Sequence, residues 1–365
     1  MSQAKPSRVR VAVVGAGYWG PNLVRVMADL SEAELVFVCD ADEGSLAKIR
    51  ESFPGVPLSR DPAEVFESPR VDAVVLATNP HTHYDLGTRA LAAGKHLYVE
   101  KPLALTVEHG EALVAKAEAA GRTLMVGHLM RYHPAVHLLQ RYVDSGELGE
   151  VLYVYATRVN LGKLRREENA LWSLAPHDIS VILHLLGSFP RRVRALGVDY
   201  VRGGVEDVVF LTMEFPNKVL AQVHVSWLDP HKVRQLTVVG KKKMAVLDDM
   251  EATEKIRIYD KGVDFTPSYR GYGESLTLRV GDILVPRVEM TEPLHIECAH
   301  FVECVAKGQR PWTDGHEGLR VLRVLDAAQR SLESQGNYVD LPEPDALGVR
   351  AGSAGTGGAA RGSEA

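Results

Sequence analysis

A short apolar segment that runs straight into a glycine-rich turn is the feature that most limits how this chain can fold. The segment VRVAVV at residues 9–14 is followed by GAGYWG at residues 15–20, and a helical pattern begins there. This strand–turn–helix order is typical of a unit that binds a dinucleotide. Its glycines allow a close backbone approach, so that helix N–H groups can hold a pyrophosphate. The expected contacts are Gly15, Gly17, Tyr18, Trp19 and Gly20.

The end of the second predicted strand indicates which dinucleotide would bind. Asp40 closes this strand 20 residues after Gly20, where a carboxylate can accept both hydroxyls of the adenine ribose. Its negative charge would repel a 2′-phosphate, and no arginine follows it within the turn. NAD is therefore the predicted cofactor, and NADP is disfavoured. The alternative is a glycine turn that holds no ligand.

Alternating strand and helix patterns extend this unit into an α/β domain. Apolar strands are predicted at 9–14, 35–39, 73–77, 96–99 and 123–126, with helices between them. That order is typical of a doubly wound parallel sheet with right-handed crossovers, the Rossmann architecture. We expect this domain to cover residues 8–128.

The pattern changes after residue 150, where strand-like runs follow one another with short turns. One helix, predicted near 176–186, interrupts them. Consecutive strands of this kind favour a large open antiparallel sheet in an α+β domain, expected at 129–340. Alternating apolar residues at 208–215 and 220–227 would leave one sheet face uncovered, which predicts a homodimer or homotetramer. The Gly- and Ala-rich tail at 346–365 is expected to be disordered.

Composition excludes several classes of function. A net charge of −5 argues against binding of nucleic acid, which requires a concentrated basic face. No apolar stretch reaches the length of a membrane span, and the first ten residues lack an apolar signal core. We therefore expect a cytoplasmic protein with no membrane partner. Its three cysteines show no metal-ligand spacing, so no metal site is predicted and the thiols are expected to be buried and inert.

A second motif, Glu100-Lys101-Pro102, directly follows the strand at 96–99. Parallel sheets bind ligands beyond the carboxyl ends of their strands, so Lys101 would lie near the reactive ring of the cofactor. Its ammonium can hydrogen-bond a reacting oxygen and stabilise negative charge that develops there. Glu100, beside it, can orient the ammonium. The alternative interpretation is a surface lysine in a turn.

The loop after the strand at 73–77 should also run beside the cofactor. Thr78 and Asn79 are predicted to contact a ribose or a phosphate. His83 is placed with them on the cofactor side, although a role in starting or capping the next helix is the favoured alternative.

His177 is the candidate general base. It stands at the predicted start of the helix at 176–186, where the helix dipole disfavours the imidazolium and lowers the pKa of the side chain. A neutral imidazole can accept a proton at physiological pH. A polar histidine at a helix start, without a chemical role, is the alternative.

These motifs together resemble one known family. The glycine fingerprint, ATNP at 77–80, Glu100-Lys101-Pro102 and APHDIS at 175–180 resemble the glucose–fructose oxidoreductase/inositol dehydrogenase family (Gfo/Idh/MocA), over about residues 8–335. The resemblance implies dehydrogenation of a secondary alcohol on a sugar, a cyclitol or a nucleotide-activated sugar. Family members commonly carry an aspartate four residues before the histidine, where this chain has Ser173. Asp178 is the candidate replacement carboxylate.

Several residues are expected on the substrate side. The segment 158–169 carries cations and amides that suit a phosphate or carboxylate, and Arg158 and Asn160 are its predicted contacts. Trp172 could stack on a sugar ring, while a solvated loop is the alternative for this segment. Arg131 and Tyr132, after the last Rossmann strand, are secondary contacts, with domain packing as their alternative. His177 and Asp178 complete the predicted substrate set.

The sequence thus predicts an NAD-dependent dehydrogenase in which Lys101 polarises the hydroxyl and His177 accepts its proton. Two alternatives stay open. One is a non-catalytic regulatory protein that senses NAD and a sugar. The other is an enzyme that uses NAD transiently to cleave a glycoside and releases no NADH.

Overall fold

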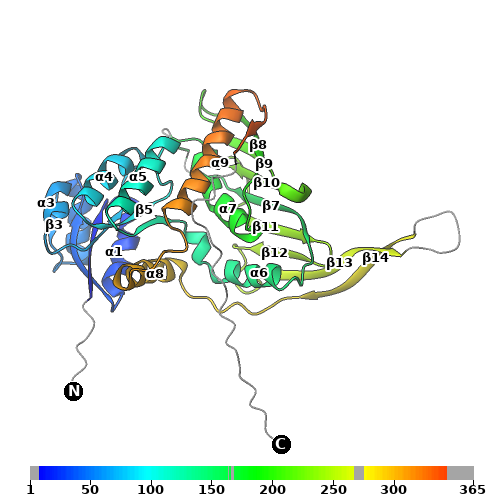
Figure 1. The fold of residues 1–365 in the computed structure, drawn as a ribbon, viewed down its shortest axis with the longest axis horizontal. Helices are drawn as coiled ribbons and strands as arrows, with labels where there is room; N and C mark the ends of the chain where they lie inside the picture. Colours follow the sequence, from blue (N-terminus) through cyan, green and yellow to red (C-terminus); the bar gives the residue numbers. More distant parts are fainter. Residues whose placement is uncertain (1–7, 163, 166–167, 267–274, 343–365) are drawn as a thin grey trace, which may run out of the picture.

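The computed structural model describes residues 8–162, 164–165, 168–266 and 275–342. It contains two sheets, each with helices packed against it (Figure 1). The predicted tail at 346–365 lies outside the described residues. Within the described part, no helix is both long and apolar enough to cross a membrane.

The first sheet confirms the predicted doubly wound parallel architecture. Its strand order is β3-β2-β1-β4-β5-β6, and every pair is parallel. The order reverses between β1 and β4, which is where such sheets bind ligands. The strands are β1 (Val9–Val14), β2 (Ala33–Cys39), β3 (Leu58–Ser59), β4 (Ala73–Leu76), β5 (His96–Glu100) and β6 (Leu124–Gly127).

Helices cover both faces of this sheet, and polar caps fix where several of them begin. The Asp42 side chain accepts a hydrogen bond from Ser45 N at the start of α2, and Thr106 accepts one from His109 N at the start of α5. The helices are α1 (Gly20–Asp29), α2 (Glu43–Ser52), α3 (Pro62–Glu67), α4 (His83–Ala92) and α5 (Val107–Ala119).

The second sheet has the strand order β14-β13-β12-β11-β7-β10-β9-β8-β15. It is antiparallel except for one parallel pair, β7 with β10, so the predicted antiparallel sheet is confirmed with that one difference. The strands are β7 (Val151–Val159), β8 (Arg192–Val198), β9 (Val208–Glu214), β10 (Leu220–Ser226), β11 (Val233–Gly240), β12 (Met244–Asp248), β13 (Ile256–Thr266), β14 (Ser275–Leu284) and β15 (Val339–Asp340).

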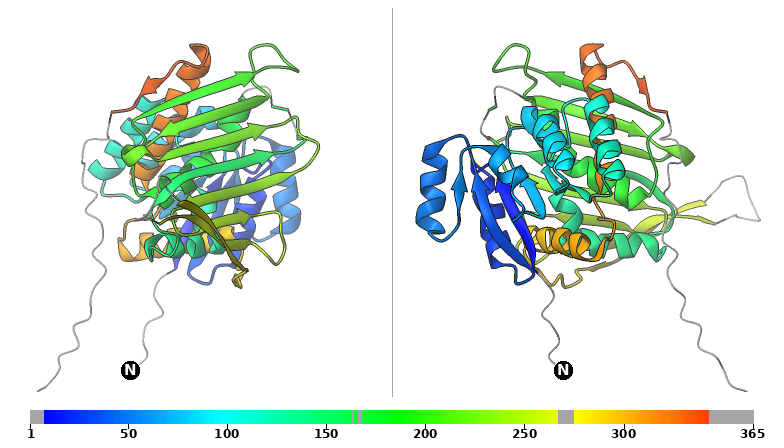
Figure 2. Two further views of the ribbon diagram at one scale, coloured as in Figure 1. Left: turned by 90° about the vertical axis from the view of Figure 1, so that its right-hand side faces the viewer. Right: turned by 60° about the vertical axis from the view of Figure 1, so that its left-hand side comes forward.

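One face of the second sheet is covered by helices and the other is open (Figure 2). The covering helices are α6 (Pro134–Asp144), α7 (Ala170–Leu186) and α9 (Gly315–Glu333). The apolar residues of α7 and of the strands beneath it form one buried cluster. Helix α8 (Pro293–Lys307) instead packs beside α1, where Phe301 and Cys298 join the core of the first sheet. The three cysteines are free and buried, as predicted.

Helix α7 begins six residues before the predicted start. Asn169 caps it by accepting a hydrogen bond from Trp172 N, and Pro176 lies inside the helix. Proline favours the first helical turn, which is why the sequence suggested a start at 176. His177 therefore lies inside the helix, and a helix start cannot be the cause of its lowered pKa.

Candidate active site

The glycine turn lies at the carboxyl ends of β1 and β4 and leaves no room for side chains at two positions. A Cβ atom on Gly15 would lie 2.5 Å from the Ala77 carbonyl carbon, and one on Gly20 would lie 2.0 Å from Gly15 O. Gly15 also has a φ of 104°, which L side chains rarely adopt. This close-packed turn at a helix start fits a pyrophosphate. The Tyr18 side chain is 92% exposed.

Asp40 lies beside this turn and is bound to it. Its Oδ2 accepts a hydrogen bond of 2.5 Å from Ala16 N, and its Oδ1 accepts one of 2.8 Å from Asp42 N. The carboxylate therefore helps to shape the glycine turn. Asp40 is only half-buried, so part of its surface stays accessible at the carboxyl edge of the sheet, where an adenine ribose is predicted to bind.

The loop after β4 approaches the second motif through a buried histidine. Both ring nitrogens of His83 face carbonyl oxygens, Pro102 O at 2.8 Å and Thr78 O at 3.2 Å. Burial lowers the pKa of His83, and the side chain has no exposed surface. His83 therefore joins the loop after β4 to the loop after β5. This buried position corrects the prediction that His83 contacts the cofactor. The Asn79 side chain accepts a bond from His81 N, and Thr78 receives one from the Thr82 hydroxyl.

Glu100 connects the glycine turn to the second motif. Its Oε1 accepts a hydrogen bond of 2.9 Å from Trp19 Nε1, and the Tyr98 hydroxyl donates to the same oxygen at 3.2 Å. Burial raises the pKa of Glu100 to about 7, against the opposing effect of the Lys101 charge. Trp19 thus contacts the residue beside the catalytic candidate, a contact that its position in the glycine motif did not predict.

Lys101 follows β5 and reaches across to α7. Its Nζ donates a hydrogen bond of 3.1 Å to Ser173 O. Burial lowers the pKa of Lys101, while the carboxylates of Glu168 and Glu100 act to raise it. Lys101 is half-buried, and its hydrogen bond joins the end of β5 in the first sheet to α7, a helix that covers the second sheet.

His177 lies one helical turn after Ser173, on the same side of α7. Its Nδ1 is buried and has no hydrogen-bond partner among the described residues. Burial, together with the charges of Lys101 and Arg158, holds the pKa of His177 well below 6.5. The ring is therefore neutral at physiological pH, and burial, not a helix start, is the main cause.

Asp178 does not face this imidazole. Its carboxylate forms a two-pronged ion pair with Arg158, with Nε to Oδ2 at 2.7 Å and Nη2 to Oδ1 at 2.9 Å. Both side chains are buried. This pair joins β7 to α7, which corrects the prediction that Asp178 supplies the missing carboxylate and that Arg158 is available to an anionic substrate group.

The remaining substrate candidates divide into buried and accessible residues. Tyr132 has no exposed surface, and its hydroxyl lies 3.1 Å from both His300 Nδ1 and Thr313 Oγ1. These contacts agree with the alternative interpretation of Tyr132, a role in packing between domains. Arg131 is buried and pairs with Glu317 at 3.3 Å. The indole of Trp172 donates to Gln329 Oε1 at 3.1 Å. Asn160 is half-buried at the end of β7.

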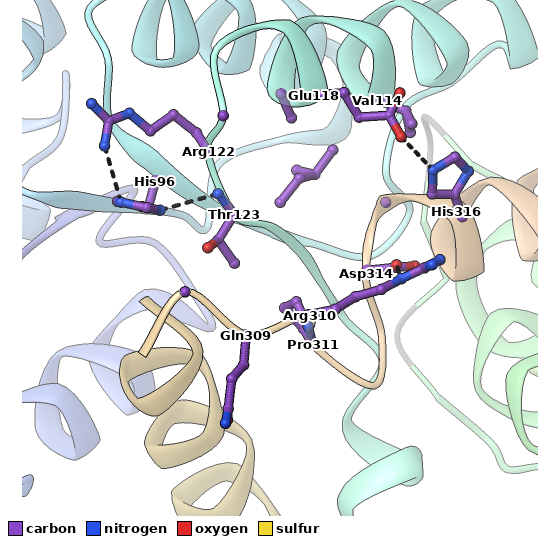
Figure 3. Close-up of a pocket in the computed structure, with 15 residues that line it drawn as sticks. His96, Val114, Glu118, Arg122, Thr123, Gln309, Arg310, Pro311, Asp314 and His316 are labelled. Carbon is purple, nitrogen blue, oxygen red and sulfur yellow. Dashed lines mark hydrogen bonds and ion pairs between the residues drawn. The ribbon is translucent and has the colours of Figure 1, made fainter. Parts of the chain in front are cut away.

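One cavity of about 340 Å³ lies away from these residues (Figure 3). It is lined by the first residues of β5 and β6, at the edge opposite to Lys101. Its polar side chains already contact one another: Arg310 pairs with Asp314, His316 pairs with Glu118, and Arg122 lies against His96. No cluster of three metal-ligating side chains occurs anywhere in the described ranges.

Comparison with known proteins adds family information to this geometry. Residues 9–128 match the family model described as an oxidoreductase family with an NAD-binding Rossmann fold, GFO/IDH/MocA. Residues 136–246 match the model of the GFO/IDH/MocA C-terminal domain. Together the two matches cover more than half of the chain.

Three similar proteins carry names that describe activities. The scyllo-inositol 2-dehydrogenase (NAD⁺) of Bacillus subtilis is 27% identical, over 90% of this chain and 95% of its own. The UDP-N-acetylglucosamine 3-dehydrogenase of Acidithiobacillus ferrooxidans is 28% identical over 89% and 98%, and its solved structure superposes with a TM-score of 0.75, covering 90% and 98% at 25% identity. The 2,7-anhydro-N-acetylneuraminate hydratase of Escherichia coli is 27% identical over 68% and 70%.

Proposed function

The chain belongs to the Gfo/Idh/MocA oxidoreductase family, and on that premise we propose that it is an NAD-dependent dehydrogenase of a secondary alcohol. The substrate class is a sugar, a cyclitol or a nucleotide-activated sugar. The dehydrogenases of scyllo-inositol and UDP-N-acetylglucosamine among its relatives support this class. We assign cofactor binding to residues 8–128 and substrate binding to residues 129–340.

The contact between Lys101 and α7 carries this proposal. It brings the Lys101 ammonium, at the carboxyl edge of the sheet that bears the glycine turn, against α7 one helical turn before His177. The buried Nδ1 of His177 has no hydrogen-bond partner among the described residues. Bound NAD supplies a hydride acceptor at that edge. A donor and a proton acceptor beside it are what the oxidation of an alcohol requires.

The two side chains divide the work on the substrate hydroxyl. Lys101 donates a hydrogen bond to its oxygen and stabilises the negative charge that develops as the proton leaves. His177 takes that proton on a ring nitrogen, because burial and neighbouring cations keep the ring neutral. In the reverse direction the imidazolium returns the proton to the carbonyl oxygen.

The test of this function is the absorbance of NADH when the purified protein is incubated with NAD and a panel of cyclitols, sugars and nucleotide sugars. We expect a substrate-dependent rise with at least one member of the panel. Tight NAD binding without any turnover would contradict the proposal and favour a regulatory protein.

A second candidate follows from the relative that is named a hydratase. Addition or loss of water changes no net oxidation state, so such an enzyme would consume its substrate without accumulating NADH. Product analysis of the same incubations separates the two candidates, because only the dehydrogenase couples each product molecule to one NADH.

The placement of Asp40 gives a prediction on cofactor choice. Asp40→Asn keeps an oxygen that can accept the bond from Ala16 N but removes the charge that repels a 2′-phosphate. The preference for NADH over NADPH should fall by about tenfold or more, because like charges brought together are costly. Fluorescence titration with both cofactors measures it.

Asp42→Asn is the matched control for this change. Asp42 caps α2 through Ser45 N, two residues beyond the predicted ribose contact, and its replacement should leave the preference unchanged. An unchanged preference in Asp40→Asn would show that this carboxylate does not face the ribose.

We also propose that two or more copies associate through the open face of the second sheet. Outward-facing apolar side chains, each 40–47% exposed, occupy neighbouring strands of this face. A contiguous apolar area of this kind marks an interface. The residues are Tyr153, Tyr155, Leu196, Phe210 and Leu220.

Light scattering at micromolar concentration tests this assembly. The wild-type protein should be a dimer or a tetramer, and Tyr155→Glu combined with Phe210→Glu should produce a smaller species, because charges would then be buried in the interface. Tyr200→Glu is the control, since this tyrosine is 71% exposed in the loop between β8 and β9. A monomeric wild-type protein would refute the assembly.

A further inference from the structure

We propose that His128 is a substrate-binding residue whose imidazole hydrogen-bonds a hydroxyl group of the substrate, beside Lys101 and His177. The inference rests on the proposed dehydrogenase function, since it takes a polyol as the ligand. The sequence motifs assigned roles to Arg131 and Tyr132 in the same segment and none to His128.

Strand register places His128 next to the catalytic candidate. In the parallel pair of β5 and β6, Glu100 is the register partner of Gly127. The residues that follow them, Lys101 and His128, therefore leave neighbouring strands at the same edge of the sheet. Neighbouring strands lie about 4.8 Å apart. This edge is the one that carries the glycine turn.

The imidazole of His128 is buried without partners. Only 1% of the residue is exposed, and neither ring nitrogen has a hydrogen-bond partner among the described residues. Its backbone is satisfied, because His128 N donates to Val126 O at 2.7 Å and His128 O accepts from Arg131 N at 2.9 Å. A neutral imidazole has one donor and one acceptor, and leaving both unpaired costs free energy.

Other buried histidines of this chain do have partners. His83 faces two carbonyl oxygens, and His133 accepts from Ala135 N at 3.1 Å while its other nitrogen lies 3.3 Å from Asp249. In the described part of the chain, the histidines with buried unpartnered ring nitrogens are His128 and His177. The lack of partners at both histidines indicates that a bound ligand forms hydrogen bonds with both imidazole rings.

The charges around His128 define the kind of group that it can bind. Burial and the cations Arg131 and Lys101 hold the pKa of His128 at about 3, with Glu317 acting in the opposite direction. The ring is therefore neutral and offers one donor and one acceptor. A hydroxyl group also donates once and accepts, so a polyol matches it, whereas a carboxylate or phosphate can only accept.

The test compares the wild-type protein with His128→Phe and His128→Asn. Phenylalanine keeps a ring of similar size without either nitrogen, and asparagine keeps a donor and an acceptor. Each protein is saturated with NADH and titrated with scyllo-inositol and with UDP-N-acetylglucosamine, using NADH fluorescence as the signal. The KM and kcat for the same two compounds are measured with NAD, and Tm is recorded for all three proteins.

We expect His128→Phe to weaken binding of the polyol by about tenfold or more and to raise KM by a similar factor. Its NADH affinity should match the wild type, and its Tm should be equal or higher, because an unpaired polar group has been removed. His128→Asn should recover part of the binding. A purely structural histidine would instead show a lower Tm with an unchanged KM.

Three results would overturn the inference: equal polyol affinity in wild type and His128→Phe, a lowered Tm with unchanged KM, or no binding of either probe to the NADH complex. Failure of the proposed function is a separate result. Polyol binding that depends on His128, without any NADH formed by the wild-type protein, would reject the dehydrogenase and keep the binding site.

Discussion

Lys101→Met should lower kcat by about a thousandfold and change the NAD affinity by less than about threefold. The ammonium is the one group of the Glu100-Lys101-Pro102 motif that can stabilise charge on a substrate oxygen. Among the described residues its Nζ makes one hydrogen bond, to Ser173 O, so the fold loses little when the ammonium is removed. Steady-state kinetics and NADH titration measure the two effects separately.

Lys95→Met provides the matched control for this prediction. Lys95 is buried next to β5, and its Nζ donates to Ser68 O and Val71 O, both at 2.8 Å. Its removal leaves two carbonyl groups without their donor, which should cost about 1–3 kcal/mol of stability with kcat unchanged. A Lys101→Met enzyme with wild-type kcat would remove Lys101 from the mechanism.

His177→Gln should lower kcat by about 10²- to 10⁴-fold, the usual contribution of a general base. The wild-type pH profile should carry a second signature of the same residue. The pKa of His177 lies well below 6.5, so the base stays neutral from physiological pH down through the ordinary range of histidine. We expect kcat/KM to fall only in more acidic solution, where the ring takes up a proton, and this acid limb should vanish in His177→Gln.

His184→Gln is the control on the same helix. His184 lies two helical turns beyond His177, about 10 Å along the axis, and burial holds its pKa at about 3. It also titrates only in acid, yet its replacement should leave kcat and the acid limb intact. A normal profile in His177→Gln, with the limb lost in His184→Gln, would reverse the assignment.

The parallel sheet could be predicted because its central strands are buried on both faces. β4 is a continuous apolar run and β1 is apolar except for Arg10. Of the helices between them, α2 and α3 begin at the capping residues Asp42 and Asp61. β3 and α3 escaped prediction because a two-residue strand and a six-residue helix are too short to show a pattern. The start of α7 was placed late because Pro176 resembles a first-turn proline.

Motifs identified candidate catalytic residues but not their partners. Lys101 and His177 could be identified because each lies in a short sequence motif, Glu100-Lys101-Pro102 and APHDIS at 175–180. The pairing of Asp178 with Arg158 and the burial of Tyr132 depend on contacts between distant segments, which spacing does not encode. In GHLMRYH at 127–133, nothing in the sequence tells which residue lies nearest to Lys101; the strand register shows that His128 leaves β6 beside the point where Lys101 leaves β5.

The transfer of hydride from substrate to cofactor is tested most directly with a substrate that carries deuterium on the carbon bearing the reactive hydroxyl. After incubation with NAD, mass spectrometry of the released cofactor measures the isotope. The proposed mechanism predicts that NADH accumulates with one deuterium and that Lys101→Met suppresses it. Consumption of the substrate with no labelled NADH in solution would contradict a dehydrogenase and favour a reaction without net oxidation.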